Sequence, residues 1–218
     1  LDWSRDGRNW PQSEDSRFLQ TPGLKWRVVQ SGEGPCVLLL HGTGASAHSW
    51  RGLIPLLQPD LTVIAPDLPG HGFTRGRPPG GLSLQAITGV LQALLAELRC
   101  EPALIVGHSA GAAIALDLAS RMRPDLPVVG FSPALMPFPG LAARLFPALA
   151  KMLFVNPFVP RVFAAMARGP GEAERFLVRS TGSHIDAEGV RCYAKLLGNS
   201  RHCEGALGMM ASWDLAAL

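Results

Sequence analysis

Residues 103–119 read ALIVGHSAGAAIALDLA, and this stretch decides the fold that we expect. The apolar run 103–106 predicts a buried strand, and the small residues after Gly111 predict a helix. Ser109 would then stand at the sharp turn between them, where Gly107 and Gly111 make room because a Cβ would clash. A serine in this place is a candidate catalytic nucleophile. It can attack only if a histidine takes its proton and an acid orients that histidine.

A second stretch, HGTGAS at residues 41–46, follows the apolar run CVLLL at 36–40. Acyl transfer needs two backbone N–H groups that converge on the oxygen atom that becomes negatively charged. We expect the first donor to be the N–H of Ala110, directly after the serine, and the second to be the N–H of Thr43. The positive end of the helix that follows Ser109 would add to this stabilisation. The two stretches together predict an oxyanion hole beside a serine nucleophile.

Strand-like and helix-like segments alternate in the first part of the chain. We expect strands at 24–30, 36–40, 61–65, 103–106 and 127–131, and helices at 49–57, 84–98 and 110–122. Ser83 would cap the helix 84–98. This alternation predicts an α/β fold with a mostly parallel sheet and helices on both faces. The carboxyl ends of its strands carry 41–43, Asp67 and Ser109, which is where such sheets place their sites. The stretch DLPGHG, 67–72, is expected to be a rigid structural turn.

The composition fits one well-packed domain, because 47% of the 218 residues are apolar and 17% are charged. The formal net charge is only +3 and no basic stripe is present, which argues against nucleic-acid binding. Four cysteines form neither a CxxC pair nor a cluster with zinc-ligand spacing, so we expect reduced thiols, no metal and no cofactor. They are Cys36, Cys100, Cys192 and Cys203. The polar N-terminus holds no signal peptide and no stretch is long enough to cross a membrane, which favours a cytoplasmic protein.

The character of the chain changes after Pro133. Residues 134–170 are rich in Phe, Met, Leu and Pro, which predicts short helices broken by the prolines. No acidic residue stands between Asp125 and Glu172, while four basic residues do: Arg144, Lys151, Arg161 and Arg168. We expect a core at 1–132, a helical cap at 133–210 and the start of a return to the core at 211–218. An apolar, cationic cap suits a flat apolar ligand with carboxylates or an anionic membrane surface, and it equally suits an ordinary cap.

The base and the acid that Ser109 requires are harder to assign. The six histidines are His41, His48, His71, His108, His184 and His202. His108 adjoins the serine and would point away from it, and we expect His41 and His71 to brace loops. His184 and His202 lie in the late helical region, where either could line a pocket. No carboxylate follows the strand 127–131, and Asp214 is not assigned a catalytic role.

The segments CVLLLHGTGAS, VIAPDLPGHG and LIVGHSAGAAIALDLA, in this order, resemble the α/β-hydrolase superfamily. In that family the nucleophile is followed by an acid and then by a histidine near the C-terminus, each after a later strand, and a helical cap follows the sixth strand. The resemblance implies that the last two strands, the acid and the base lie beyond Leu218, so that the chain is incomplete at its C-terminus. The other interpretation is that catalysis has been lost.

The opening DWSRDGRNWPQSEDSRFLQ and the late stretch TGSHIDAEGVRCYAKLL also resemble a narrower group, the magnesium-chelatase accessory proteins of bacteriochlorophyll biosynthesis. That resemblance implies a role around metal insertion into protoporphyrin in a phototroph. The partners it implies are magnesium-chelatase subunits and a small apolar or tetrapyrrole-like ligand, with peripheral membrane contact as a further option.

Two functions therefore stay open on the sequence. The first is a serine hydrolase acting on an ester or acyl group, or on a C–C bond next to a ketone. The second is a tetrapyrrole- or chelatase-binding scaffold without turnover, because a fold alone does not settle function.

Overall fold

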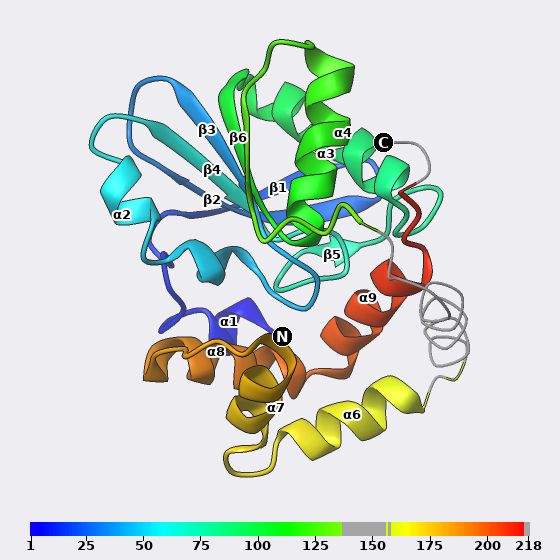
Figure 1. Ribbon diagram of the computed structural model, residues 1–218. Helices are drawn as coiled ribbons and strands as arrows, with labels where there is room; N and C mark the ends of the chain where they lie inside the picture. The colour runs from blue at the N-terminus through cyan, green and yellow to red at the C-terminus, as the bar shows by residue number, and fades with distance from the viewer. Residues whose placement is uncertain (137–155, 157, 216–218) are drawn as a thin grey trace.

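A computed structural model describes residues 1–136, 156 and 158–215 and shows a sheet flanked by helices (Figure 1). The strand order is β1-β2-β4-β3-β6-β7, and β5 pairs with β2. The strands are β1 (Ser16–Thr21), β2 (Leu24–Ser31), β3 (Cys36–Leu40), β4 (Thr62–Pro66), β5 (Arg75–Gly76), β6 (Pro102–His108) and β7 (Val128–Phe131). Strands β4, β3, β6 and β7 run parallel to one another, whereas β2 pairs antiparallel with β1, β4 and β5. The α/β-hydrolase fold is confirmed, with a sheet that is mixed.

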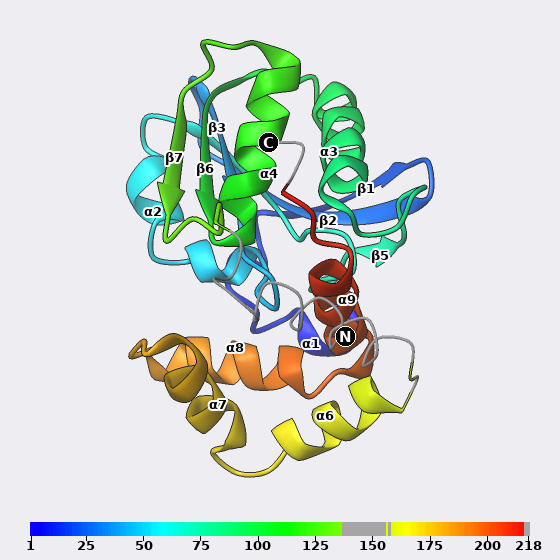
Figure 2. The same ribbon diagram turned by 45° about the vertical axis from the view of Figure 1, so that its right-hand side comes forward.

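Helices cover both faces of this sheet (Figure 2). One face carries α3 (Leu84–Leu98) and α4 (Ala110–Met122), and the other carries the 3-10 turn η1 (Ala47–Trp50) and α2 (Ile54–Leu57). Strand β3 shows why the core is double: Leu38 and Leu40 pack under α3 and α4, while Leu39 packs toward η1. Alternate residues of a strand point to opposite faces, so a continuous apolar run serves two layers.

The predicted helix positions agree with the structure except at 49–57. Ser83 caps α3 by accepting a hydrogen bond from the N–H of Ala86, at 3.3 Å. The single helix predicted at 49–57 is instead split into η1 and α2, with Pro55 in the first turn of α2. Proline is favoured in a first turn and disfavoured inside a helix, which explains the break.

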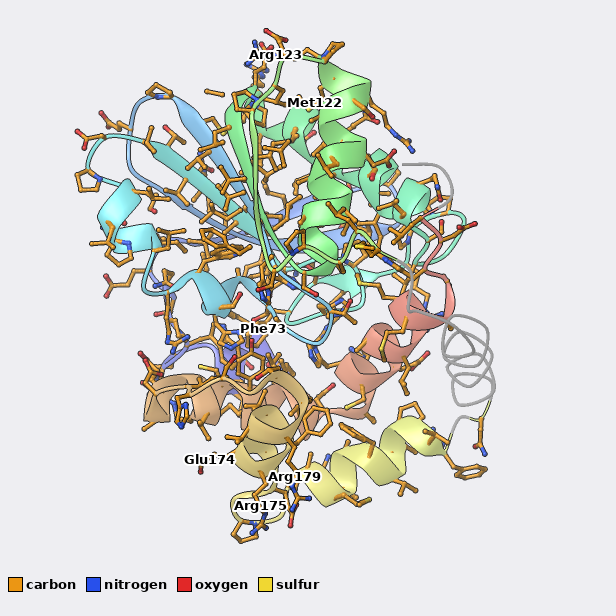
Figure 3. All side chains as sticks on the ribbon, in the orientation of Figure 1. Phe73, Met122, Arg123, Glu174, Arg175 and Arg179 are labelled. Carbon is orange, nitrogen blue, oxygen red and sulfur yellow. A yellow bond between two sulfur atoms is a disulfide. The ribbon has the colours of Figure 1, made fainter. Side chains whose placement is uncertain are left out.

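Four further helices and the short N-terminal helix α1 (Trp3–Asp6) lie at the carboxyl-end side of the parallel strands (Figure 1). They are α6 (Val159–Ala167), α7 (Glu172–Thr181), α8 (Ala187–Leu197) and α9 (Ser200–Ala211). Phe73 packs with Trp10, Cys192 and Leu196, and so joins the loop after β4 to α8 (Figure 3). The boundaries at 132 and 210 stay predictions, and Arg144 and Lys151 lie outside the described residues.

The expectation that all cysteines are reduced thiols is wrong for one pair. Cys36 and Cys100 form a disulfide, with their Cα atoms 6.8 Å apart. The cause is the sheet register, because β3 and β6 are parallel neighbours in which Cys36 pairs with Pro102. Cys192 and Cys203 are free and buried, as expected.

Within residues 1–136, 156 and 158–215, no helix combines the length and the apolar character that a bilayer crossing requires. In the same part of the chain, no group of three or more His, Cys, Asp or Glu side chains is arranged to hold a metal ion.

Candidate active site

Ser109 lies at the turn between β6 and α4 and adopts a strained backbone conformation, with φ of 54° and ψ of −119°. A positive φ is unfavourable for a residue with a Cβ and costs about 1–3 kcal/mol. Three hydrogen bonds hold the turn: the Ser109 N–H donates to the Phe131 carbonyl at 3.0 Å, and the Ser109 carbonyl accepts from the N–H groups of Ala112, at 3.0 Å, and Ala134, at 3.1 Å. The side chain is half-buried. This is the strained strand-to-helix turn that the sequence predicted.

The glycines at the turn are required by close backbone packing. A Cβ on Gly107 would stand 2.5 Å from the backbone nitrogen of Ala112. A Cβ on Gly111 would overlap the carbonyl oxygen of Leu40, at the end of β3. The first turn of α4 therefore lies directly on the strand that leads into the stretch 41–46.

The stretch 41–46, called the oxyanion loop below, lies against the serine. A Cβ built on Gly42 would stand 3.0 Å from the Cβ of Ser109. Thr43 is half-buried. It directly follows Gly42, which is the residue that lies against Ser109. Among the described residues, neither the Thr43 N–H nor the Ala110 N–H has a hydrogen-bond acceptor. The structure thus brings the loop and the serine together, and the role of these two amides as oxyanion donors stays a prediction.

A buried histidine supports the oxyanion loop from inside. His41 is fully buried, and its Nε2 accepts a hydrogen bond from the Leu68 N–H at 2.9 Å. The Nδ1 of the ring lies 2.8 Å from the Gly42 carbonyl, so the neutral ring donates there. Burial lowers the pKa of His41 well below its ordinary value. This agrees with the predicted bracing role.

Asp67 ties three segments together beneath the site. Its carboxylate accepts hydrogen bonds from the N–H groups of Ala47, at 2.8 Å, and Phe73, at 2.9 Å. It also pairs with Arg27 at 3.3 Å, and both side chains are fully buried. A buried pair is retained only when hydrogen bonds satisfy its remaining atoms, as they do here. The contacts fit the structural role predicted for 67–72.

The remaining histidines do not complete a catalytic triad in the described residues. His108 is exposed, and His184 is exposed between α7 and α8. His71 points its Nδ1 at the Pro69 carbonyl, 3.0 Å away. The hydroxyl of Ser109 has no hydrogen bond to a histidine or a carboxylate within the part of the chain that the structure describes.

Sequence reasoning missed the contacts that α9 makes with the oxyanion loop. His202 lies with its Nε2 3.0 Å from the Gly44 carbonyl, and Thr43 donates its hydroxyl to the Met209 sulfur at 3.0 Å. These pairs are separated by more than 150 positions in the chain. The only local signal was the small residue Gly205, which hinted at close packing of this helix.

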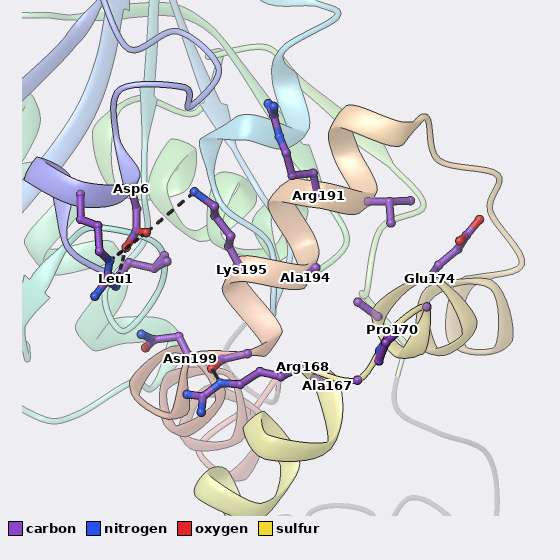
Figure 4. A pocket seen from close by; sticks show the side chains of 16 residues that line it. Leu1, Asp6, Ala167, Arg168, Pro170, Glu174, Arg191, Ala194, Lys195 and Asn199 are labelled. Carbon is purple, nitrogen blue, oxygen red and sulfur yellow. Dashed lines mark hydrogen bonds and ion pairs between the residues drawn. The ribbon is translucent and has the colours of Figure 1, made fainter.

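A cavity of about 670 Å³ lies away from Ser109, between the N-terminal segment, α8 and the turn from α6 to α7 (Figure 4). Its wall carries both signs of charge. Lys195 stands 3.8 Å from Asp6, and the Arg168 Nε donates to the Gly198 carbonyl at 2.9 Å. The serine does not line this cavity.

Comparison with known proteins agrees with this geometry. The alpha/beta hydrolase family model matches residues 37–214. The magnesium-chelatase 30 kDa subunit of Rhodobacter capsulatus is 41% identical over 96% of this chain and 74% of its own length. An esterase of Mycobacterium tuberculosis is 40% identical over 53% of this chain and 37% of its own.

Solved structures share the architecture. An alpha/beta hydrolase fold protein from Burkholderia ambifaria has a TM-score of 0.68 at 18% identity, covering 91% of this chain and 71% of its own. At that identity the likeness concerns the fold alone. The family model matches most of the chain, and the serine turn, the oxyanion loop and the sheet are all present. The chain therefore belongs to the alpha/beta hydrolase family.

Proposed function

We propose that this protein is an accessory protein of magnesium chelatase in bacteriochlorophyll biosynthesis, built on a serine-hydrolase site. Two findings support this. The relative named as a magnesium-chelatase subunit matches 96% of the chain. Ser109 occupies the strained turn beside the oxyanion loop, and this strained strand-to-helix turn is the setting of the serine nucleophile in α/β-hydrolases. The second finding is the one on which the chemistry rests.

In the proposed reaction, the Ser109 hydroxyl oxygen attacks a carbonyl carbon and its proton passes to a histidine base. The developing oxyanion accepts hydrogen bonds from the N–H groups of Thr43 and Ala110, which have no other acceptor among the described residues. Such donors are worth ~10²–10³ in rate each because they are already oriented. The substrate class is an ester or acyl group, or a C–C bond next to a ketone, on a small apolar or tetrapyrrole-like molecule. We place the base and the acid outside the described residues.

The test is labelling of the full-length protein with a fluorophosphonate probe, which phosphonylates activated serines. We expect labelling of the wild type and none of Ser109→Ala. Ser132→Ala is the matched control, since Ser132 also follows a strand and also has a positive φ, of 42°. It should label like the wild type. A folded wild type that resists the probe contradicts the hydrolase assignment.

A binding scaffold without turnover is the second candidate. It is favoured by one observation, that no histidine or carboxylate contacts the Ser109 hydroxyl in the described part of the chain. Here Ser109→Ala in a phototrophic host should leave bacteriochlorophyll synthesis unchanged, and the protein should still co-purify with a chelatase subunit. Loss of pigment in that variant would exclude the scaffold.

The location in the cell is also a proposal. We place the protein in the cytoplasm, where it could touch a membrane surface. Co-sedimentation with vesicles containing anionic lipid tests this contact, and protein that stays in the supernatant argues against it.

A further inference from the structure

Helix α9 packs on the loops that surround Ser109 at backbone distance. A Cβ placed on Gly205 would overlap the carbonyl oxygen of Gly70, in the turn after β4. A Cβ placed on Gly70 would stand 3.0 Å from the Cα of Gly205. Contact this close leaves little room for sliding, so the helix holds one position relative to that turn. The residues on either side of Gly205 then reach two loops at once.

His202 connects these two loops through its ring. The side chain is 2% exposed. Its Nδ1 accepts a hydrogen bond from the Gly72 N–H at 3.1 Å, and its Nε2 lies 3.0 Å from the Gly44 carbonyl. An acceptor at Nδ1 and a carbonyl facing Nε2 require the neutral ring with its hydrogen on Nε2. One imidazole thus satisfies a backbone donor of the turn and a backbone acceptor of the oxyanion loop.

About two turns of helix α9 after His202, a second contact reaches Thr43, the residue before Gly44 in the oxyanion loop. The Thr43 hydroxyl donates to the sulfur of Met209 at 3.0 Å, and Met209 is fully buried. Thr43 and Gly44 are therefore both held by α9. Gly44 has φ of +76° and no neighbour near the position of a Cβ. A glycine without neighbouring side chains is conformationally free unless its peptide groups are bound. The hydrogen bond from His202 to the Gly44 carbonyl therefore restrains the backbone here.

We infer that α9 sets the position of the Thr43 amide through His202 and Met209, which makes these two residues positioning residues of the oxyanion hole. The inference rests on the proposed function, since it assigns a role to the Thr43 N–H in that site. Its physical basis is that an oxyanion donor contributes only when it is held in place before the reaction. A ligand or partner that shifts α9 would then change the reactivity of Ser109 without touching it.

The test uses the full-length protein and the rate of phosphonylation by the same fluorophosphonate probe, whose phosphoryl oxygen enters the oxyanion hole. His202→Leu fills the space of the imidazole with an apolar side chain and removes both hydrogen bonds. We expect the maximal labelling rate to fall tenfold or more while the probe concentration for half-maximal rate stays unchanged. His202→Gln, which can both accept and donate, should recover much of the rate. His184→Gln, at an exposed position, is the control and should match the wild type.

Met209→Leu tests the second contact and preserves packing volume. We expect a smaller loss, a fewfold, and the same loss in Thr43→Val, with no further loss when both changes are combined. Folding is checked by thermal melting of each variant. If folded His202→Leu labels as fast as the wild type, or if His202→Gln labels no faster than His202→Leu, the inference is overturned.

Hydrogen–deuterium exchange separates this inference from the proposed function. In His202→Leu, exchange in residues 41–48 should rise by about tenfold or more, and exchange in β3 should stay unchanged. This readout does not depend on catalysis. A wild type that never labels, together with the rise in exchange, defeats the proposed function alone. Unchanged exchange in 41–48 defeats the positioning role whether or not Ser109 labels.

Discussion

Acid should destabilise this protein through its buried histidines at a pH where carboxylates are still charged. His41, His48, His71 and His202 are at most 2% exposed. Burial is the largest cause that lowers each pKa, to about 3 for His48 and His202 and about 4 for His71, and well below its ordinary value for His41. Three of these rings form a cluster: the ring centre of His71 is 5.4 Å from that of His41 and 5.2 Å from that of His202.

A folded-state pKa below the unfolded value of 6.5 means that the unfolded chain binds more protons between the two values, so stability is lost as pH falls through 6.5. From pH 7.5 to 5.5 each such imidazole costs about 1.4 kcal/mol of unfolding free energy at 25 °C. This loss of about 1.4 kcal/mol hardly depends on the folded-state pKa once that pKa is below about 4.5. His48, His71 and His202 together cost roughly 4 kcal/mol, which is a large share of the stability of an ordinary domain, and His41 adds to this loss in the same direction.

The assay is urea denaturation at pH 7.5 and 5.5 of the wild type and His202→Gln, with exposed His184→Gln as the control. The variant should lose about 1.4 kcal/mol less than the wild type across this interval, whatever its stability at pH 7.5. The control should lose as much as the wild type. Carboxylates contribute little to the difference, because unfolded Asp and Glu titrate near pH 4. Equal losses in His202→Gln and the wild type would refute the assignment of a buried neutral ring.

Three further changes test the support of the site. Gly111→Ala should destabilise the protein by about 2 kcal/mol or more and abolish labelling of Ser109, because the new Cβ overlaps the Leu40 carbonyl; a stable, reactive variant in melting and labelling assays would disprove the packing argument. Asp67→Asn should cost about 3–5 kcal/mol in urea, since it leaves the buried charge of Arg27 unpaired, and a loss under 1 kcal/mol would contradict that. Cys36→Ser should cost about 4 kcal/mol, as expected for opening a covalent loop with a sequence separation of 64. An unchanged denaturation midpoint would show that the bond does not stabilise the fold, and two free thiols at Cys36 and Cys100 in a thiol titration would show that it does not form.

The parts of the fold that were predictable rest on local physics. The serine turn is coded by glycines within two positions of Ser109, and the capped helix α3 by Ser83 and apolar residues at helical spacing. Buried parallel strands such as β3 are recognisable in the sequence as short apolar runs, because both of their faces are covered. Strand β1 escaped prediction for the opposite reason. It pairs only with β2 and leaves polar residues such as Arg17 and Gln20 along its length.

The parts that were not predictable depend on which distant segments meet. The disulfide forms because β3 and β6 are neighbours in register, a fact of strand order that the spacing of four cysteines does not contain. In the same way, the sequence places His202 in a late helical region, where it could line a pocket. Its two ring nitrogens instead bind the backbone of Gly44 and Gly72. Which role a histidine takes is decided by what its neighbours leave unsatisfied, and only the packed chain determines that.

The buried polar groups around Ser109 share one task, which explains why so costly a set is kept. Asp67, His41 and His202 each bind backbone amides or carbonyls of the loops at the carboxyl ends of the strands. Loops of this kind would otherwise be loose, because they lack the ladder bonds of a sheet. These contacts hold the peptide groups with neutral rings and one compensated charge. In the proposed site this would fix the direction of the Thr43 and Ala110 N–H groups, which have no acceptor among the described residues. Catalysis by oriented dipoles requires this rigidity, which is why the packing of these loops supports the proposed hydrolase site more than the binding scaffold.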